Sequence, residues 1–359
     1  MKQIQNYTGI RLISDILKDT DRKSISKIVY EFIRLFIKYR ELPLHYFTHY
    51  LYKKGTNDFM AYMPNKLSSK IPSAFNDSLV KQVLDDKLYF SLFYDQKGIR
   101  LPKMTAYNNR NLFTVGSKTR VIKNTEDFRD FALELFKQNP SCDTLFIKKT
   151  YSSSGGKNIH ILSLEGLRNQ DISVDEVFFD LIGSAFVFQE GVIQHPELNR
   201  LNPYSLNTIR FDTFIDREGK IEVISGMLKM STNNAAVDNL TSGGCAVGID
   251  LNTGRLRKTG YVKMQYYGTR TLKEHPITGV KFEDFSIPFL TEAKEMVLKA
   301  AGLMPALRLI GWDVGISEKG PVLIEGNSDY GLSTNDFTNG GYMTNETFRK
   351  VLCEFQSIK

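Results

Sequence analysis

Residues 312–327, WDVGISEKGPVLIEGN, contain two runs of alternating apolar residues on either side of the segment SEKGP. Gly and Pro between two such runs are typical of a β-hairpin. When the turn is centred on Lys319, Asp313 lies opposite Glu325. The two-residue period of a strand then sends Asn327 to the same face as both acids and leaves the other face apolar. The stretch therefore predicts a hairpin with one acidic face.

Two opposed carboxylates need a positive charge between them, because like charges directly across a sheet are destabilising. Two carboxylates and an amide carbonyl are hard oxygen ligands that suit Mg²⁺, which keeps several waters and is completed by substrate phosphates. We therefore predict Asp313, Glu325 and Asn327 as ligands of Mg²⁺, with Mn²⁺ as a second candidate ion. A solvated acidic hairpin without a metal is the alternative.

The composition is that of a folded soluble protein. The chain has 359 residues, 42% hydrophobic and 24% charged, which is enough for two or three packed subdomains. Its three cysteines are odd in number and widely separated, which argues against a disulfide framework and favours a reducing cytoplasm. The N-terminus lacks an apolar core of signal-peptide length, and no run approaches the roughly 18 apolar residues of a spanning helix. We expect a cytoplasmic protein.

The formal net charge of +7 favours anionic partners, such as a nucleotide, an acidic polymer or a membrane surface. Simple solubility explains the charge equally well. No nucleic-acid-binding motif is present, so we predict no nucleic acid partner. Because basic residues are modestly concentrated near the N-terminus, peripheral contact of this region with the inner membrane surface stays open.

The N-terminal region is predicted to be helical. Ser24 can cap an amphipathic helix that ends at residues 41–43, ELP. One stripe of this helix contains Ile25, Ile28, Val29, Phe32, Ile33, Phe36 and Ile37. The next segment, residues 45–55, HYFTHYLYKKG, is aromatic and basic. It would suit a membrane interface or an acidic glycan, but packing against the rest of the protein is the favoured interpretation.

The remainder of the chain favours an α+β fold with mainly antiparallel sheets, because strands mix with helices without regular βαβ alternation. Helices are expected within residues 85–103, before a turn at Gly98, and over residues 125–138 and 343–357. Strands are expected at residues 145–149, 158–162, 185–189, 207–215 and 221–230.

A loop of small residues, TYSSSGGKN at residues 150–158, follows Lys148. Ser and Gly let the backbone approach an anion and direct several N–H groups toward it, which is how a phosphate is held. The loop is not a Walker motif, because GxxxxGK[ST] is absent and the loop joins two strands. A flexible hairpin is the structural alternative.

A lysine, a phosphate loop and a magnesium hairpin in this order resemble the ATP-grasp ligases. The matching segments DDKLYF, LFIKKTYSSSGGKNI, FVFQEGVIQHP, SLNTIRF and IGWDVGISEKGPVLIEGN span residues 85–327, about two thirds of the chain. More narrowly, QHPELNRLNPYSLNTIR, DNLTSGGCAVGID and GWDVGI…GPVLIEGN are similar to the sugar-transfer-associated branch, found with polysaccharide biosynthesis. The resemblance implies an ATP-grasp fold with ATP between two α+β lobes. Its parts would be a helical N-terminal region (1–84), a small lobe with a Gly/Ser-rich lid (85–190) and a C-terminal lobe with the metal hairpin (191–359).

The resemblance also implies roles for single residues. Lys87 and Lys148 would bind the ATP phosphates. The closing loop would comprise Ser152, Ser153, Ser154, Gly155 and Gly156. The strand between the lobes would comprise Gln189, Glu190, Gly191 and Val192. In this strand, the backbone groups of Glu190 and Val192 would contact the adenine. The magnesium ligands of the family would correspond to Asp313, Glu325 and Asn327.

Two catalytic cations follow from the same resemblance. Arg210 matches an arginine that relatives aim at the γ-phosphate or the acyl phosphate, and Lys229 is a second positive group. The sequence departs from the family at Lys149, where many relatives have Pro, and at Gly311, where some ligases carry Arg. Arg210 or Lys229 must then supply the missing charge.

The implied activity is ATP-dependent, ADP-forming carboxylate–amine ligation through an acyl phosphate. Positive groups would neutralise the charge that develops when a carboxylate attacks the γ-phosphate, and a closed lid would exclude water. The expected substrates are an amino acid or amine and a sugar acid or glycan precursor of polysaccharide biosynthesis. The alternatives are an ATP-grasp peptide or natural-product ligase, and a non-catalytic nucleotide-binding module of a surface-polysaccharide assembly.

Four further features have weaker interpretations. His195 is expected to have a structural or substrate-contact role, and His160 to pack or lie at the surface. Residues 237–248, VDNLTSGGCAVG, are expected to form a loop that is either a simple turn or an acceptor-positioning element. Trp312 is expected in the core.

Overall fold

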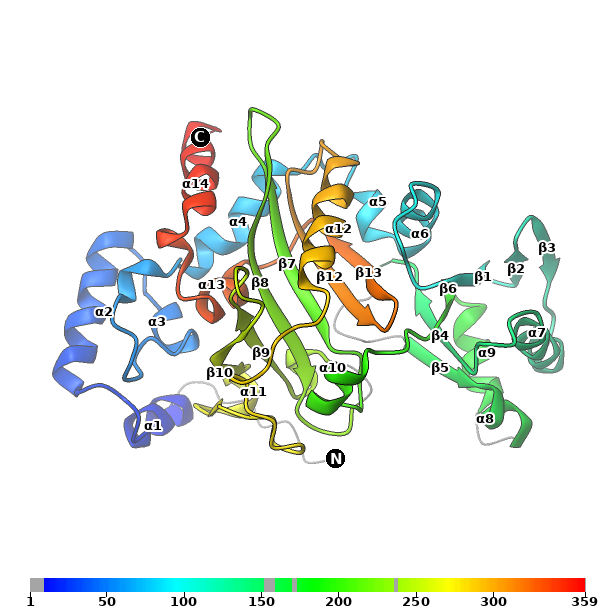
Figure 1. Ribbon diagram of the computed structural model, residues 1–359, viewed down its shortest axis with the longest axis horizontal. Coiled ribbons are helices and arrows are strands. Elements are labelled where there is room, and N and C mark those ends of the chain that lie inside the picture. Colours follow the sequence, from blue (N-terminus) through cyan, green and yellow to red (C-terminus); the bar gives the residue numbers. More distant parts are fainter. Residues whose placement is uncertain (1–9, 152–158, 170–172, 236–237, 359) are drawn as a thin grey trace. The chain divides into compact units, whose positions relative to one another are not determined.

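The computed structural model describes residues 10–151, 159–169, 173–235 and 238–358 (Figure 1). The chain forms two compact units. Unit 1 contains residues 1–80, 194–321 and 327–359, and unit 2 contains residues 81–193 and 322–326. Both units combine helices with antiparallel sheet, which confirms the predicted α+β class.

Unit 2 is built on a six-stranded sheet in the order β3-β2-β1-β6-β4-β5, and every neighbouring pair is antiparallel. Its strands are β1 (Met104–Asn109), β2 (Leu112–Val115), β3 (Lys118–Val121), β4 (Thr144–Lys149), β5 (Ile159–Ser163) and β6 (Ala185–Glu190). Its helices are α5 (Gln82–Asp85), α6 (Lys87–Gln96), α7 (Thr125–Gln138), α8 (Leu164–Asn169) and α9 (Val174–Leu181). The sequence predicted β4 to β6 but not β1 to β3.

Helix α7 shows how local sequence fixes an element of unit 2. Asn124 caps it by accepting a hydrogen bond from the Asp127 amide at 2.8 Å, and acidic residues in the first turn complement the helix dipole. Its apolar side presents Phe128 and Phe131 to Phe113 of β2, with ring centroids 5.1–6.0 Å apart. The predicted helix at residues 125–138 is confirmed, and it supplies much of the core of unit 2.

A seven-stranded sheet in the order β11-β10-β9-β8-β7-β12-β13 forms the centre of unit 1. Its strands are β7 (Thr208–Ile215), β8 (Ile221–Ser231), β9 (Gly244–Ile249), β10 (Leu256–Val262), β11 (Thr271–Leu272), β12 (Leu309–Ser317) and β13 (Gly320–Asn327). Residues 322–326 of β13 group with unit 2, so the two units share this strand. The helices around this sheet include α10 (Pro196–Leu201), α11 (Met264–Tyr267), α12 (Leu290–Gly302) and α13 (Ser333–Thr338).

The hairpin predicted from residues 312–327 is present as β12 and β13. Gly320 has φ +101°, a left-handed conformation that glycine adopts at little cost, and the Ser317 hydroxyl donates to its carbonyl at 2.9 Å. Trp312 is fully buried and donates from Nε1 to the Thr213 hydroxyl at 2.8 Å. The core assignment of Trp312 is therefore confirmed.

The predicted loop at residues 237–248 is wrong in its second half. Residues from Gly244 to Gly248 belong to β9, which is buried along its whole length. A Cβ at Gly244 would lie 2.5 Å from the Asp238 carbonyl oxygen, and one at Gly248 would lie 2.2 Å from that of Thr338. These glycines permit close backbone approach within a packed sheet, a role that glycine also has in strands.

The N-terminal helices α1 (Ile10–Lys18), α2 (Ile25–Tyr39), α3 (His45–Thr48) and α4 (Asn65–Phe75) belong to unit 1. Ser24 caps α2 as predicted, accepting from the Lys27 amide at 3.3 Å. The aromatic segment after α2 packs inside, since Tyr46, Tyr50 and Tyr52 are at most 2% exposed. The favoured interpretation of this segment is confirmed. None of the described helices is long and apolar enough to cross a membrane.

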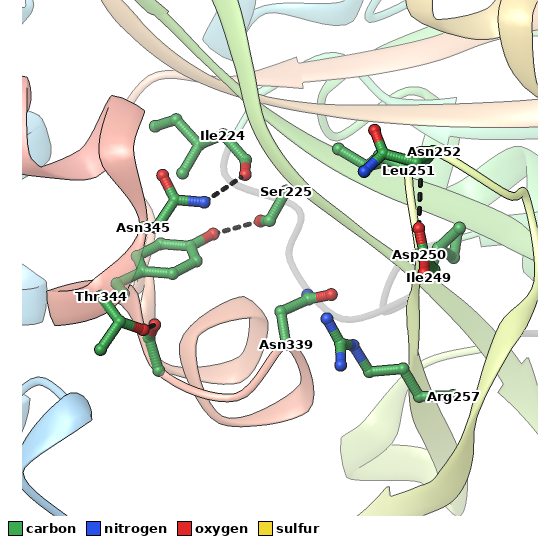
Figure 2. A pocket seen from close by; sticks show the side chains of 12 residues that line it. Ile224, Ser225, Ile249, Asp250, Leu251, Asn252, Arg257, Asn339, Thr344 and Asn345 are labelled. Carbon is green, nitrogen blue, oxygen red and sulfur yellow. Dashed lines mark hydrogen bonds between the residues drawn. The ribbon is translucent and has the colours of Figure 1, made fainter. Parts of the chain in front are cut away.

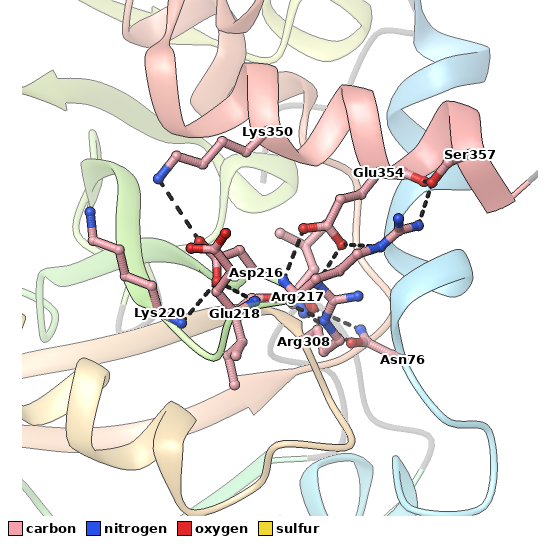
Figure 3. Close-up of polar contacts among 11 residues, drawn as sticks. Asn76, Asp216, Arg217, Glu218, Lys220, Arg308, Lys350, Glu354 and Ser357 are labelled. Atoms are coloured by element: carbon pink, nitrogen blue, oxygen red, sulfur yellow. Dashed lines mark hydrogen bonds and ion pairs between the residues drawn. The ribbon is translucent and has the colours of Figure 1, made fainter.

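The C-terminal helix α14 (Glu346–Ile358) is tied to the strand ends of unit 1 (Figure 3). Arg308 donates to Glu354 at 2.6 Å, and the Arg217 backbone amide donates to the same carboxylate at 3.1 Å. Lys350 pairs with Glu222. These contacts confirm the predicted closing helix and fix it against the sheet.

Candidate functional site

In unit 2, the two predicted phosphate-binding lysines lie near each other. Lys87 is the first residue of α6, whose N-cap Asp86 accepts from the Leu88 amide at 2.8 Å. The Lys87 amide donates to the carbonyl of Thr150, at the exit of β4, at 2.9 Å. Lys148 is two residues earlier and partly buried. The fold therefore brings together two lysines that are far apart in sequence.

Desolvation lowers the pKa of Lys148 to about 8 from an ordinary 10.5. The negative charge of Glu325 raises this pKa and the positive charge of Lys87 lowers it further. These effects place Glu325, a predicted metal ligand, and Lys87 within electrostatic range of Lys148. A partly buried cation with incomplete compensation is well suited to an anionic ligand, which would restore its ordinary pKa.

The predicted adenine segment lies at the end of β6. Gln189 is buried, and its side-chain amide donates from Nε2 to the Ser91 hydroxyl at 3.3 Å. The Glu190 amide donates to the Lys103 carbonyl at 2.9 Å, and the Gly191 amide to the Thr144 carbonyl at 3.1 Å. An adenine contact at Glu190 would therefore use its carbonyl oxygen. The predicted lid residues Ser152, Ser153, Ser154, Gly155 and Gly156 lie outside the described residues.

In unit 1, Arg210 and Lys229 converge on Asp313. Arg210 is the cross-strand partner of Asp313 between β7 and β12, and its guanidinium makes two bonds to the carboxylate, at 2.7 and 2.8 Å. Lys229 of β8 reaches the same carboxylate at 3.0 Å. The side chains of Asp313, Arg210 and Lys229 are 4%, 14% and 14% exposed. Two cations thus converge on one carboxylate in a nearly buried cluster.

The departure at Gly311 has a steric explanation. A Cβ at this position would lie 2.9–3.1 Å from ring atoms of Tyr330, which is too close for any side chain there without a shift of the ring. The Tyr330 ring also lies 5.6 Å below the Arg210 guanidinium, a cation–π arrangement. Tyr330 therefore occupies the space an arginine would need, while Arg210 brings a guanidinium to Asp313 from the neighbouring strand.

The predicted magnesium ligands have donor atoms that suit the ion. Asn327 donates from Nδ2 to the Gly311 carbonyl at 3.3 Å, which orients its amide beside β12. Carboxylate and amide oxygens are ligands of the hard type that Mg²⁺ takes. Within the described ranges, no three His, Cys, Asp or Glu side chains gather as a metal site. The predicted set has only two carboxylates, so its fit depends on the amide of Asn327.

Asp238 is electrostatically coupled to this cluster. It accepts from the backbone amide of Thr208 at 3.2 Å and from the hydroxyl of the same residue. Burial raises the pKa of Asp238, the charge of Lys229 lowers it, and the charge of Asp313 raises it again. The sequence had singled out Asp238 only as part of a loop with an uncertain role.

Asp212 and Tyr342 were not foreseen from the sequence. Asp212 is fully buried and accepts from the Tyr342 hydroxyl at 2.6 Å. Burial raises the pKa of Asp212 to about 6, although Tyr342 and Arg210 act to lower it. The available signal was spacing: Asp212 follows Arg210 by two residues and so shares its face of β7.

The two histidines considered from the sequence have structural contacts. His195 caps α10, where its Nδ1 accepts from the Glu197 amide at 3.1 Å. His160 lies 2.6 Å from a carboxylate oxygen of Asp180 at the surface of unit 2. Neither contact places a histidine beside the Asp313 cluster.

A cavity of about 350 Å³ opens between β8, the β9–β10 turn and the segment before α14 (Figure 2). Its polar wall residues largely bond within the protein. Asn345 donates to the Ile224 carbonyl at 3.0 Å, and Asp250 accepts from the Asn252 amide at 2.9 Å. These bonds hold strands and turns together, so the cavity is not assigned to the chemistry of the Asp313 cluster.

Residues 66–351 match the sugar-transfer-associated ATP-grasp family. No curated protein sequence matches the chain.

Solved structures similar to this one include D-alanyl-alanine synthetase A from Vibrio cholerae O1 biovar eltor, at 14% identity and a TM-score of 0.45, covering 77% of this chain and 66% of that one. The D-cycloserine synthetase DcsG has 13% identity and a TM-score of 0.45, with 80% and 74% covered. The biotin carboxylase domain of 2-oxoglutarate carboxylase from Hydrogenobacter thermophilus has 12% identity and a TM-score of 0.43, with 74% and 44% covered. The chain thus spans less than two thirds of the length of the first and third of these proteins.

Proposed function

Because the chain belongs to the sugar-transfer-associated ATP-grasp family, we propose that it is an ATP-dependent carboxylate–amine ligase that forms ADP and works through an acyl phosphate. The observation that carries this proposal is the convergence of Arg210 and Lys229 on Asp313. A cluster that brings two cations together with little exposure can stabilise a phosphoryl group during transfer.

In the first step, a carboxylate oxygen of the acid attacks the γ-phosphorus of ATP, and the bond from this phosphorus to the β,γ-bridging oxygen breaks to release ADP. In the second step, the amine attacks the acyl carbon, inorganic phosphate leaves, and the amine nitrogen loses a proton. Arg210 and Lys229 would neutralise the charge on the transferring group. Lys87 and Lys148 would hold the phosphates, and Lys148 carries its proton at neutral pH because its pKa of about 8 is above 7.

Asp313, Glu325 and Asn327 are the proposed ligands of Mg²⁺, or alternatively Mn²⁺, which would supply further neutralisation of the ATP phosphates. When nucleotide is absent, the Asp313 carboxylate would pair with the cations of Arg210 and Lys229. When ATP is bound, these cations would turn to phosphate oxygens. This exchange keeps every buried charge paired, which avoids the large cost of an isolated buried ion.

The remaining assignments concern the nucleotide. Residues Ser152 to Gly156 are proposed as a lid that excludes water from the acyl phosphate. Gln189 to Val192 are proposed to meet the adenine, with Glu190 and Val192 contributing backbone groups. Functionally, the chain would divide into a helical region at residues 1–84, a small lobe at 85–190 and a C-terminal lobe at 191–359.

The proposed substrates are an amino acid or amine and a sugar acid or glycan precursor, in cytoplasmic steps of polysaccharide biosynthesis. The description of the family as sugar-transfer associated supports this class. Ligation of peptides or natural products, and nucleotide binding without turnover in a polysaccharide assembly, are the competing functions. The ligase functions differ from each other in the amide product, and the binding module differs from both because it forms no ADP.

The test is to incubate the protein with MgATP and pools of carboxylates and amines, and to measure ADP, AMP and phosphate. ADP formation that requires both an acid and an amine supports the proposal; AMP formation would indicate adenylation, and tight ATP binding without turnover would indicate a binding module. Glu325→Gln should lower turnover about 100-fold or more, because it removes a charge from the proposed metal site. Glu318→Gln, an exposed acid in the turn of the same hairpin, is the matched control and should leave turnover unchanged.

A further inference from the structure

Helix α2 carries a large apolar surface on its outward side. Ile28 of the predicted apolar stripe is buried, but six large hydrophobic side chains of the helix are 43–66% exposed. These outer residues, here named the α2 apolar face, are Ile25, Val29, Tyr30, Ile33, Phe36 and Ile37. Their spacing of three, four and seven residues places them on adjoining sides of one helix. Contiguous apolar surface of this kind is characteristic of a docking site.

The inner side of α2 is fixed by a buried polar cluster. Lys23 and Glu31 form an ion pair of 2.7 Å, with side chains 4% and 2% exposed. The Tyr46 hydroxyl also donates to Glu31 at 2.7 Å, and Leu35 packs fully buried one turn further along. Rotating the helix to bury its outer side would break this pair and leave a charge uncompensated. The α2 apolar face is therefore held outward by the fold.

A basic edge borders the α2 apolar face. Lys27, Arg34 and Lys38 are exposed and follow one another at seven and four residues, so they line one side of the helix. Arg34 donates to the Tyr30 hydroxyl at 2.7 Å, and its guanidinium lies 5.6 Å from that ring. The Lys38 ammonium lies 4.9 Å from the Tyr39 ring. The contact with Tyr30 thus keeps the Arg34 guanidinium beside the α2 apolar face.

We propose that the α2 apolar face docks on an anionic lipid bilayer, with α2 lying in the plane of the interface. Apolar side chains beside a row of Lys and Arg match the acyl boundary and the negative headgroups of such a surface. A second copy of the chain fits less well, because its identical basic edge would bring like charges into the contact. This docking does not depend on the ligase activity proposed above.

The test is sedimentation of the full chain with vesicles of phosphatidylcholine, with and without about one third phosphatidylglycerol. We expect binding to the anionic vesicles only, weakened by salt because screening reduces the attraction of the basic edge. The double variant Ile33→Asn, Phe36→Asn should lower the partition coefficient by about tenfold or more, since two large side chains no longer enter the bilayer. Phe179→Asn, which changes a 65% exposed aromatic in unit 2, is the matched control.

The charge arm uses the double variant Arg34→Gln, Lys38→Gln, which should weaken binding to anionic vesicles. Its control, Lys118→Gln with Lys123→Gln, changes two exposed lysines of unit 2 and should not. Failure of the unchanged protein to bind anionic vesicles would overturn the proposal, as would equal binding by the apolar variant. A particle of twice the 41.0 kDa chain mass that this variant converts to monomer would assign the face to a second copy instead.

Discussion

Lys148 offers the sharpest test of the site's electrostatics, because replacing it should stabilise the folded protein. Its pKa is lowered from 10.5 to about 8, a difference worth about 3 kcal/mol. A base with a lowered folded pKa binds its proton more tightly in the unfolded chain, so the charged form opposes folding below about pH 8. Lys148→Met removes this cost. The variant should therefore gain up to about 3 kcal/mol of unfolding free energy near pH 7, while losing ATP-dependent turnover.

The gain should shrink as the pH rises, because the folded wild-type chain sheds the Lys148 proton above about pH 8 and the unfolded chain only near 10.5. The measurement must report on unit 2. Trp312, the sole tryptophan, lies in unit 1, whereas Cys142 is 7% exposed within unit 2. Accessibility of Cys142 to a thiol reagent, followed by mass spectrometry across a urea series, gives the required midpoint.

Lys149→Met is the control, since successive residues of a strand point to opposite faces. Any change that Lys149→Met causes in the urea midpoint should not show the decrease with rising pH that is expected for Lys148→Met. If Lys148→Met is less stable than the wild type near neutral pH, and the difference is constant from about pH 7 to about pH 10, desolvation of Lys148 is refuted. ATP should bind with uptake of protons at about pH 8, because phosphate raises the lowered pKa again.

The other predictions concern unit 1. Gly311→Arg should lower thermal stability by about 1–3 kcal/mol, because the new side chain meets the Tyr330 ring, and Tyr330→Ala should relieve part of this loss; an unchanged melting temperature would contradict the steric explanation. Burial raises the pKa of Asp336 from 3.8 to about 7, so the unfolded chain loses this proton first and stability should fall by up to about 4 kcal/mol as the pH rises from about 4 to 7. Urea unfolding followed by Trp312 fluorescence should show this decline, with Asp212 acting in the same direction, and Asp336→Asn should flatten it.

The cluster at Asp313 links stability to the proposed activity. Without a phosphate, one buried carboxylate holds both Arg210 and Lys229, so these cations are already positioned and desolvated before any ligand arrives. Preorganised charge of this kind avoids reorganisation during the reaction. It also explains how a chain with Gly311 can dispense with an arginine at that position: the guanidinium arrives from β7 and rests on Tyr330 instead.

Local sequence was sufficient for many elements. Helix α7 has the predicted bounds, and its polar N-cap, acidic first turn and regularly spaced apolar residues show why local sequence is sufficient there. The hairpin of β12 and β13 follows from the alternating apolar runs on either side of a turn centred on Lys319. The short strands β1 to β3 were missed because their residues are mostly polar or exposed, which leaves little periodic signal. The sequence predicts a loop where β9 lies, because its glycines are typical of turns. In the structure these glycines instead allow close contact with neighbouring backbone.

For the candidate site, the sequence by itself determined which residue types were available and which shared a strand face, as with Asp313 on the hairpin and Arg210 with Asp212 on β7. It also determined that α2 would be amphipathic. Only the tertiary structure decided that Arg210 and Lys229 meet on Asp313, that Tyr330 fills the space beside Gly311, and that most of the α2 stripe stays exposed. The reason is physical: periodicity fixes the direction of a side chain relative to its own strand or helix, whereas charge pairing, burial and pKa depend on neighbours brought in from distant parts of the chain.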